Sequence, residues 1–119
     1  MSQFGLSREL RLLTTRHFKF VFEYPKRVST RYITILSRFN KRNHPRIGLT
    51  VSKKNIKYAH ERNRVKRLIR DSFRKNQYQL AEMDFIVIAK IGVSKVDNNE
   101  LTGILERLWH HHYRLHQKY

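Results

Sequence analysis

The chain has 119 residues, which is enough for one compact domain and too few for two substantial ones. Its 26 Lys and Arg against 9 Asp and Glu give a formal net charge of +17, which favours a polyanionic partner. Its hydrophobic content of 39% is too high for a disordered chain. The absence of Cys excludes disulfides, thiolate zinc sites and thiol nucleophiles.

The segment "TTRHFKFVFEYP" (14–25) predicts a first helix. Thr14 or Thr15 can cap its start, and Pro25 ends it. Three apolar side chains share one side of this helix at i, i+3, i+4 spacing: Phe18, Val21 and Phe22. Phe20 falls on the opposite side.

Two strands are predicted next. Residues 31–39, "RYITILSRF", are rich in β-branched and aromatic residues, with Ile33 and Ile35 on one face. The other face of this strand carries Tyr32, Thr34 and Leu36. In residues 46–54, "RIGLTVSKK", apolar side chains alternate with small ones such as Gly48. The short polar turn between the two segments predicts that they pair as antiparallel strands.

A strongly basic helix follows, with Asn55 or a residue just after it as its cap and an end near Gln77. A projection at about 100° per residue places its apolar side chains on one arc. This arc is the predicted core face, and it consists of Tyr58, Val65, Leu68, Ile69 and Phe73.

A cationic stripe runs along the same helix at i, i+4 steps, through Arg62, Lys66, Arg70 and Arg74. Asn63 and Arg67 fall on the same side, and Arg64 stands on a second flank. Like charges at this spacing destabilise a helix by about 0.2–0.5 kcal/mol per pair. A solvated helix face is the simplest interpretation of such a stripe. The scarcity of interleaved acids and the net charge favour a phosphate-binding surface instead.

The last two elements are a buried strand and a helix. "DFIVIAK" (84–90) predicts the strand, and Asp97 with Glu100 forms a variant of the capping box. The apolar stripe of the helix is Leu101, Ile104, Leu105 and Leu108. The order α-β-β-α-β-α predicts an α+β layer sandwich over residues 1–119, a single domain with helices packed on a small central sheet.

Residues 46–74, "RIGLTVSKKNIKYAHERNRVKRLIRDSFR", resemble the signature of the bacterial ribonuclease P protein subunit. The shared features are the Gly-Leu-x-Val-Ser-Lys-Lys strand end at 48–54 and the Arg-Asn-Arg helix at 62–67. The segments "LTTRHFKFVFEYP" and "DFIVIAK" and the closing helix also follow the order of that family. The resemblance implies a fold that contains a left-handed βαβ crossover, against the usual right-handed rule.

The resemblance also implies a function in tRNA maturation. In the family, the catalytic RNA of ribonuclease P removes the 5′ leader of precursor tRNA with magnesium ions that the RNA mainly binds. The protein subunit binds both RNAs and has no catalytic residues of its own. No small-molecule substrate and no tightly bound metal are expected for the protein.

Family resemblance assigns two sets of site residues. Contact with the catalytic RNA is expected from Arg62, Asn63, Arg64, Lys66, Arg67 and Arg70, and Arg74 extends this set by helical geometry alone. The leader is expected in a cleft between the sheet and the first helix, lined by Phe18, Phe22, Tyr32, Lys53 and Lys54. Aromatic rings there can stack bases of any sequence. Plain core packing of Phe18 and Phe22 is the alternative.

Histidines 110–112, together with His116, suggest a metal site, but consecutive side chains point around a helix and no suitable carboxylate is near in sequence. We interpret them instead as an extension of the basic surface. The acidic residues show no pair suited to general acid and base catalysis.

Two other classes of function account for the charge. One is a ribosomal or general RNA-binding protein without a role in tRNA processing, and the other is a polybasic protein that binds anionic membranes. The membrane class is disfavoured because the apolar residues of the basic helix are needed for the core. The N-terminus lacks the apolar core of a signal peptide and the longest apolar run is "FIVIA", so no membrane partner and a cytoplasmic location are expected.

Overall fold

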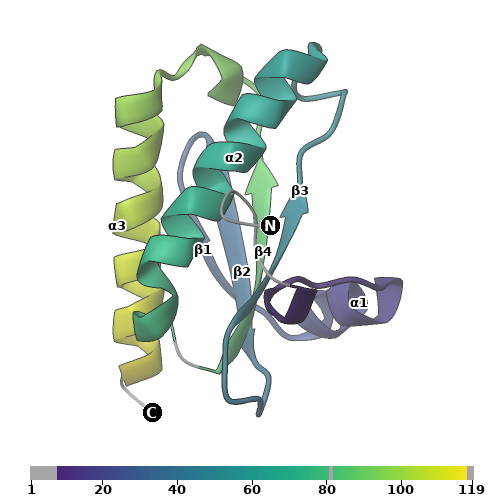
Figure 1. Ribbon diagram of the computed structural model, residues 1–119, viewed down its shortest axis with the longest axis vertical. Helices are drawn as coiled ribbons and strands as arrows, with labels where there is room; N and C mark the ends of the chain where they lie inside the picture. The colour runs from purple at the N-terminus through teal and green to yellow at the C-terminus, as the bar shows by residue number, and fades with distance from the viewer. Residues whose placement is uncertain (1–7, 81, 118–119) are drawn as a thin grey trace.

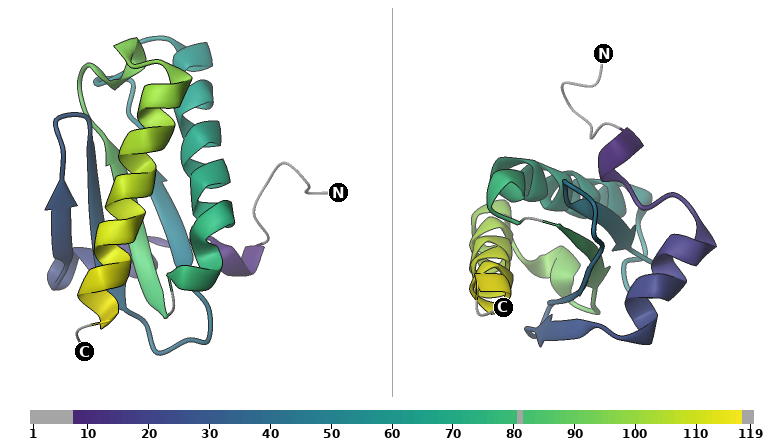
Figure 2. Two further views of the ribbon diagram at one scale, coloured as in Figure 1. Left: turned by 90° about the vertical axis from the view of Figure 1, so that its left-hand side faces the viewer. Right: turned by 90° about the horizontal axis from the view of Figure 1, so that it is seen from below.

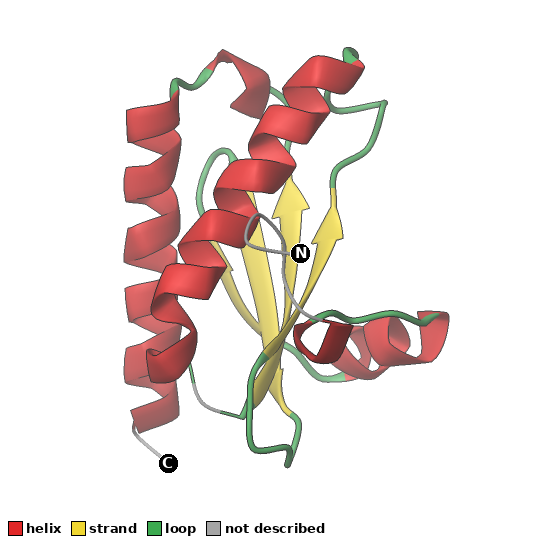
Figure 3. Cartoon of the chain, in the orientation of Figure 1, coloured by secondary structure: helices red, strands yellow, loops and turns green. Residues whose placement is uncertain are grey.

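The computed structural model describes residues 8–80 and 82–117, which form a four-stranded sheet with helices on both faces (Figures 1 and 3). The helices are α1 (Thr15–Glu23), α2 (Ala59–Asn76) and α3 (Asn98–Gln117). The strands are β1 (Lys26–Ser29), β2 (Ile33–Phe39), β3 (Arg46–Thr50) and β4 (Met83–Ala89). Single 3-10 turns are η1 (Arg8–Leu10), η2 (Gln77–Gln79) and η3 (Val93–Lys95). The predicted α+β class and the predicted elements are confirmed, and β1 is an additional strand.

The strand order is β1-β2-β4-β3, so β4 lies between the two strands that were expected to pair with each other. It is antiparallel to β2 and parallel to β3. The predicted antiparallel pairing of residues 31–39 with 46–54 is therefore wrong. The physical reason is that β4 carries apolar side chains on both faces, with Phe85 and Val87 on one and Ile86 and Ile88 on the other, and such a strand is buried best at the centre.

β3 and β4 are parallel neighbours joined through α2, which makes a βαβ crossover. In Figure 1 both strands point upward and α2 lies in front of the sheet. The chain leaves β3, runs through α2 and enters β4, which lies to the left of β3. A crossover that moves leftward when viewed from the helix side is left-handed, whereas almost all such connections are right-handed. The handedness implied by the family resemblance is confirmed.

The two faces of the sheet are covered differently. α2 and α3 cover one face of the sheet (Figure 2). Beneath them lies the larger apolar cluster, in which Phe73, Phe85 and Trp109 make edge-to-face contacts. α1 crosses the other face, where Val21 packs with Leu36 and Ile86 of the smaller cluster. The α1 face is thus only partly covered.

α1 begins as predicted, because the Thr14 side chain accepts a hydrogen bond from the His17 amide. The prediction that Phe18 and Phe22 share one side of this helix, with Phe20 on the opposite side, is only partly right. Phe18 and Phe20 are both half-buried against the sheet, whereas Phe22 is 50% exposed. The helix meets the sheet along the line of fully buried Val21, which turns Phe22 outward.

α2 and α3 follow the predicted apolar arcs with two corrections. Val65, Ile69 and Phe73 are fully buried, but Tyr58 is exposed because it is the N-cap residue, outside the helix. Asn55 is not the cap, since its side-chain amide donates to the Ala89 carbonyl at 2.9 Å. In α3 the four predicted apolar side chains are buried, and the Asp97 carboxylate caps the Glu100 amide at 2.8 Å.

The histidine run of α3 does not lie wholly on the surface. His112 is 2% exposed, its ring packs edge-to-face on Phe85, and its Nδ1 is 2.9 Å from Oγ of Ser37 on β2. Burial lowers its pKa to about 4. The prediction that this histidine extends the basic surface is therefore wrong, while His110 and His111 are exposed. The side chain of His116 lies outside the described residues.

Candidate nucleic-acid interface

Three of the predicted cations of α2 bind other parts of the chain. The Arg62 guanidinium donates to the carbonyls of Ile56 and Lys57 at 3.0 and 2.9 Å, which fixes the turn that precedes the helix. Arg64 donates to Asn98 Oδ1 at 2.7 Å and to the Ser94 carbonyl at 3.0 Å. This arginine therefore ties α2 to the start of α3.

Arg74, the third of these cations, forms an ion pair with Asp71 at 3.1 Å, one turn away on the same helix. The spacing is i, i+3, and both side chains are about a third exposed. A pair of this kind contributes little to stability, typically about 0.3–0.5 kcal/mol. It does lower the net charge at the C-terminal end of the stripe.

The middle of the stripe is different. Lys66, Arg67 and Arg70 form no ion pair with any residue that the structure describes, and Asn63 and Arg67 are exposed. Asn63 and Arg67 lie on the side of α2 opposite Val65 and Ile69, and Lys66 and Arg70 are partly buried beside them. The structure thus brings together the predicted cations at the centre of α2 as a surface that can contact phosphates.

The open face of the sheet next to α1 is built in rows across the strands. Leu36, Ile86 and Gly48 form one row, and Thr34, Ile88 and Thr50 form the next. The Phe18 ring lies on Gly48, so closely that a Cβ on that residue would be 2.5 Å from Phe18 Cζ. Glycine is therefore required for α1 to approach the sheet. Thr34 is buried, but Ile88 is only partly buried and Thr50 is exposed, which leaves the β3 end of the second row accessible beside the helix.

The five residues predicted to line the leader cleft are not all on this face. Phe18 and Phe22 belong to α1, and Lys53 and Lys54 are exposed in the turn that follows β3. Tyr32 precedes β2, and its ring packs against the opposite cluster, within 3.4 Å of the position of a Cβ on Gly92. The prediction that Tyr32 shares a face with Thr34 and Leu36 is wrong, because the strand alternation begins only at Ile33.

Arg38 forms a stacked group with two aromatic rings that the sequence did not predict. Its guanidinium carbon lies 3.9 Å from the Phe20 ring centre and 5.1 Å from that of Tyr24. It also donates to the Phe20 carbonyl at 2.6 Å and pairs with Glu23 at 3.6 Å. The group fastens the C-terminal half of α1 to β2 by cation–π contact and hydrogen bonds.

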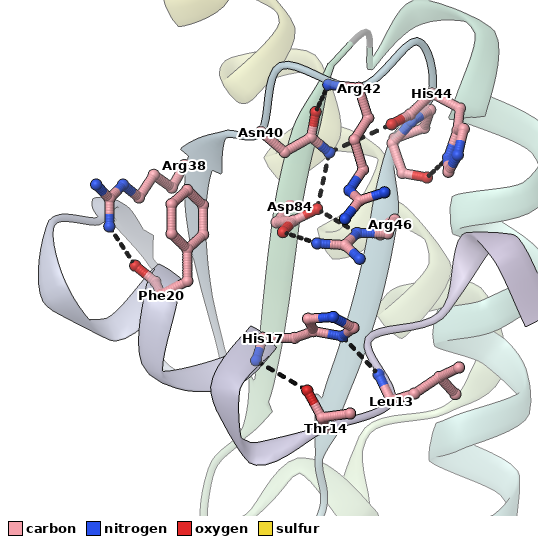
Figure 4. Close-up of polar contacts among 11 residues, drawn as sticks. Leu13, Thr14, His17, Phe20, Arg38, Asn40, Arg42, His44, Arg46 and Asp84 are labelled. Carbon is pink, nitrogen blue, oxygen red and sulfur yellow. Dashed lines mark hydrogen bonds and ion pairs between the residues drawn. The ribbon is translucent and has the colours of Figure 1, made fainter.

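A buried ion pair stands at the end of the same face (Figure 4). Arg46 of β3 donates through Nε and Nη2 to the Asp84 carboxylate at 2.8 and 2.6 Å, and Asn40 Nδ2 donates to Asp84 at 2.8 Å. The side chains of Arg46 and Asp84 are 9% and 0% exposed. Sequence reasoning missed this pair, although an Asp that opens the apolar run "DFIVIA" must find a buried partner.

His17 of α1 lies close to this pair in Figure 4, and its Nδ1 accepts a hydrogen bond from the Leu13 amide at 3.2 Å. Burial lowers its pKa, and the charges of Arg46, Arg42 and Arg16 lower it further against the opposing charge of Asp84. The neutral ring therefore carries its proton on Nε2. This geometry makes His17 a hydrogen-bond donor among arginines.

Neither a metal cluster nor a membrane span is found in the part of the chain that the structure describes. No three His, Asp or Glu side chains there are grouped to hold a metal ion. Among the same residues, no helix is long and apolar enough to cross a membrane.

Comparison with known proteins gives consistent matches. The family model described as Ribonuclease P matches residues 6–113. The ribonuclease P protein component of Cronobacter sakazakii is 58% identical over 115 residues, 97% of each chain, and that of Proteus mirabilis is 55% identical over 118 residues, 99% of each chain. The solved RNase P protein of Staphylococcus aureus superposes with a TM-score of 0.77 at 28% identity, over 82% of this chain and 90% of that chain. The sequence comparison and the fold comparison thus both match ribonuclease P proteins.

Proposed function

The chain belongs to the ribonuclease P protein family, and we propose that it assists an RNA subunit that carries out the cleavage, by binding that RNA and the 5′ leader of precursor tRNA. Family membership makes it a protein subunit of an endoribonuclease in tRNA processing. The division of labour between protein and RNA is the proposal. The observation that carries it is the set of cations at the centre of α2 that form no ion pair with any described residue.

The α2 surface is proposed to bind the catalytic RNA. Lys66, Arg67 and Arg70 have no acidic partner among the described residues, so phosphates can take that place without breaking an internal ion pair. Arg62 and Arg64, which the family resemblance also assigns to the RNA, fasten the N-terminal half of the helix to the preceding turn and to the start of α3, and each keeps further N–H groups for an RNA contact. The helix thus presents a rigid row of donors, which lowers the entropy cost of binding.

The α1 face is proposed to hold the leader. Phe22 presents half of its surface to solvent, and Phe18 borders the accessible sheet row of Thr50 and Ile88. An aromatic ring contributes about 1–3 kcal/mol per stacked base without requiring one sequence. Leaders differ among tRNAs, so such tolerance suits this substrate. Lys53 and Lys54 can neutralise phosphates at the end of that row.

We propose that the protein supplies no catalytic group, and six of its nine acidic side chains are engaged by other groups of the chain. Those with a resolved structural partner are Glu23, Glu61, Asp71, Asp84, Asp97 and Glu106. Each of them is engaged by an arginine, a helix N-terminus or a neighbouring side chain. We propose that the magnesium ions of the reaction are held mainly by the RNA. Since both proposed partners are RNAs, we place the protein in the cytoplasm.

Cleavage of a 5′-extended precursor tRNA by bacterial ribonuclease P RNA at low magnesium, with and without the protein, tests the proposal. The protein is expected to restore cleavage at the mature 5′ end, because its cations replace the charge neutralisation that magnesium provides. Polylysine is the control for charge alone. An unchanged rate with folded protein, or equal stimulation by polylysine, would favour the alternative of a general RNA-binding protein.

A further inference from the structure

A pocket of about 200 Å³ opens where β3 begins, beside the first turns of α1 (Figure 4). It is lined by Arg16 and His17 of α1, by Arg42 of the connection between β2 and β3, and by the Arg46–Asp84 pair. An adjoining hollow of about 460 Å³ shares Arg42 and Arg46 with it and is lined further by Arg8, Glu9 and Arg11. The family resemblance assigned no role to any of these residues.

The floor of the pocket is a guanidinium in a fixed position. Arg46 uses Nε and Nη2 for Asp84, and Asn40 supports the same carboxylate from the other side. Nη1 of Arg46 has no hydrogen-bond partner among the described residues, although the side chain is 9% exposed. A guanidinium anchored through one edge presents its remaining donors without loss of side-chain entropy.

The walls carry positive charge that the described part of the chain does not neutralise. Arg16 and Arg42 form no ion pair there, and neither do Arg8 and Arg11 in the adjoining hollow. In Figure 4 the Arg42 side chain extends toward the Arg46–Asp84 pair, so like charges converge on one space. Asp84 is the single carboxylate among the three arginines that line the pocket, so a net positive charge remains there, which a bound anion would offset.

We propose that this pocket binds a phosphate group of an RNA backbone, with Arg16, Arg42 and Nη1 of Arg46 as its charged donors and His17 Nε2 as a neutral one. Guanidinium groups match phosphate oxygens in geometry as well as charge. The volume lies below the range of about 300–1,000 Å³ typical of sites for whole small-molecule ligands, which suits a single group of a longer chain.

The position of the pocket identifies the RNA as the precursor strand, and this step rests on the proposed function. Along β3, Arg46 lines the pocket, Gly48 lies under Phe18, and Thr50 leads to Lys53. The pocket and the proposed leader row therefore lie on opposite sides of α1, about 13 Å apart at the rise of a strand. A single strand of RNA that passes over α1 can contact both.

The first test compares Arg16→Gln/Arg42→Gln with Arg107→Gln/Arg114→Gln, a pair of exposed arginines on α3. Affinity is measured for precursor tRNA and, separately, for the catalytic RNA. The pocket variant is expected to bind the precursor at least about tenfold more weakly than the control variant does, since the loss of even one of its two charge-assisted hydrogen bonds has that effect, and binding of the catalytic RNA should be unchanged. Equal precursor affinities for the two variants would overturn the inference while leaving the proposed function intact.

A second test stands apart from the proposed function. Inorganic phosphate and a short oligouridylate are titrated into the protein while NMR follows the His17 ring and the Asn40 side-chain amide. Saturable shifts with both probes in the wild type, absent in Arg16→Gln/Arg42→Gln, would support the pocket even if the protein failed to stimulate cleavage. Shifts with inorganic phosphate that the oligouridylate neither causes nor reverses would overturn the RNA assignment.

Discussion

Gly48 is the residue on which the geometry of the α1 face depends. A Cβ there would lie 2.5 Å from Phe18 Cζ and 3.2 Å from Leu12 Cδ1. The sequence showed a glycine inside a strand but not what approaches it, because the contact joins residues that are 30 positions apart in the chain. Its backbone is ordinary strand, so close approach, and not a left-handed conformation, requires the glycine.

Gly48→Ala is expected to lower the free energy of unfolding by about 1–3 kcal/mol, since the ring of Phe18 has to move away from an overpacked contact. Urea unfolding measures this loss, and precursor affinity should fall with it while binding of the catalytic RNA is kept. The added change Phe18→Leu removes the clashing ring atoms and should recover part of the stability. Losses that simply add in the double variant would show that Phe18 and Gly48 are not in contact.

His112 differs in burial from the two histidines that precede it in the sequence. The side chains at positions 110, 111 and 112 are identical, but only that of His112, which faces Phe85, is buried. The helical arc through Leu101, Ile104, Leu105 and Leu108 passes through position 112 at the next i+4 step. That periodicity could have predicted its burial.

The buried His112 predicts a loss of stability in acid. Its pKa falls from an ordinary value of 6.5 to about 4 on folding, so between these values the unfolded chain binds more protons than the native one. Stability is therefore complete above pH 6.5 and should fall by about 2 kcal/mol between about pH 7 and pH 5. Urea unfolding of the wild type and of His112→Phe at both pH values tests this. If the free energy of unfolding of the wild type and of the variant falls equally between the two pH values, His112 is not the cause of the loss.

At the scale of elements, α2 was predicted well because its apolar period and its charges agree. The register of Val65, Ile69 and Phe73 placed the cations on the outer side, as observed. Periodicity could not show that Arg62 and Arg64 are held by the chain's own acceptors, since these acceptors lie in loops and at the start of α3, whereas the Arg74–Asp71 pair at i, i+3 within α2 could have been expected from the sequence. The stripe consequently divides into anchored ends and a free centre.

Arg67→Ala/Arg70→Ala is expected to reduce binding of the catalytic RNA and to flatten its salt dependence. If each arginine contacts one phosphate, the slope of log affinity against log salt should become smaller by about 1.4–1.8. Arg107→Ala/Arg114→Ala on α3 removes the same charge from exposed positions and should leave the slope nearly unchanged. Circular dichroism checks folding, which both pairs should retain. Equal slopes for the two variants would mean that α2 acts only as diffuse charge.

The sheet marks the limit of prediction from local patterns. Alternation and β-branched composition correctly predicted β2 and β3, and a continuous apolar run predicted β4, but β1 is only four residues long and reads "KRVS", with too little periodicity to be distinguished from a loop. The strand order depends on which strand is apolar on both faces, and local turn length pointed to the wrong pair. Pairing between distant segments is a tertiary property that no single stretch of sequence contains.

For the whole molecule, the sheet separates two proposed RNA surfaces. α2 lies on one face and α1 on the other, as the two views of Figure 2 show, so one RNA can bind without covering the site of the next. The left-handed crossover places α2 on the side away from α1. This handedness could be expected only from the family resemblance, because the general rule predicts its opposite. The net charge of +17 favours the binding of a polyanion at both surfaces.

The most direct test of this account is photo-crosslinking within the assembled complex of protein, catalytic RNA and precursor tRNA. A benzoylphenylalanine replaces Phe22 in one sample and Arg67 in another, since both side chains are exposed and lie on opposite faces of the sheet. The account predicts that position 22 crosslinks to the 5′ leader and position 67 to the catalytic RNA. Crosslinks from both positions to the same RNA, or the reverse assignment, would contradict it.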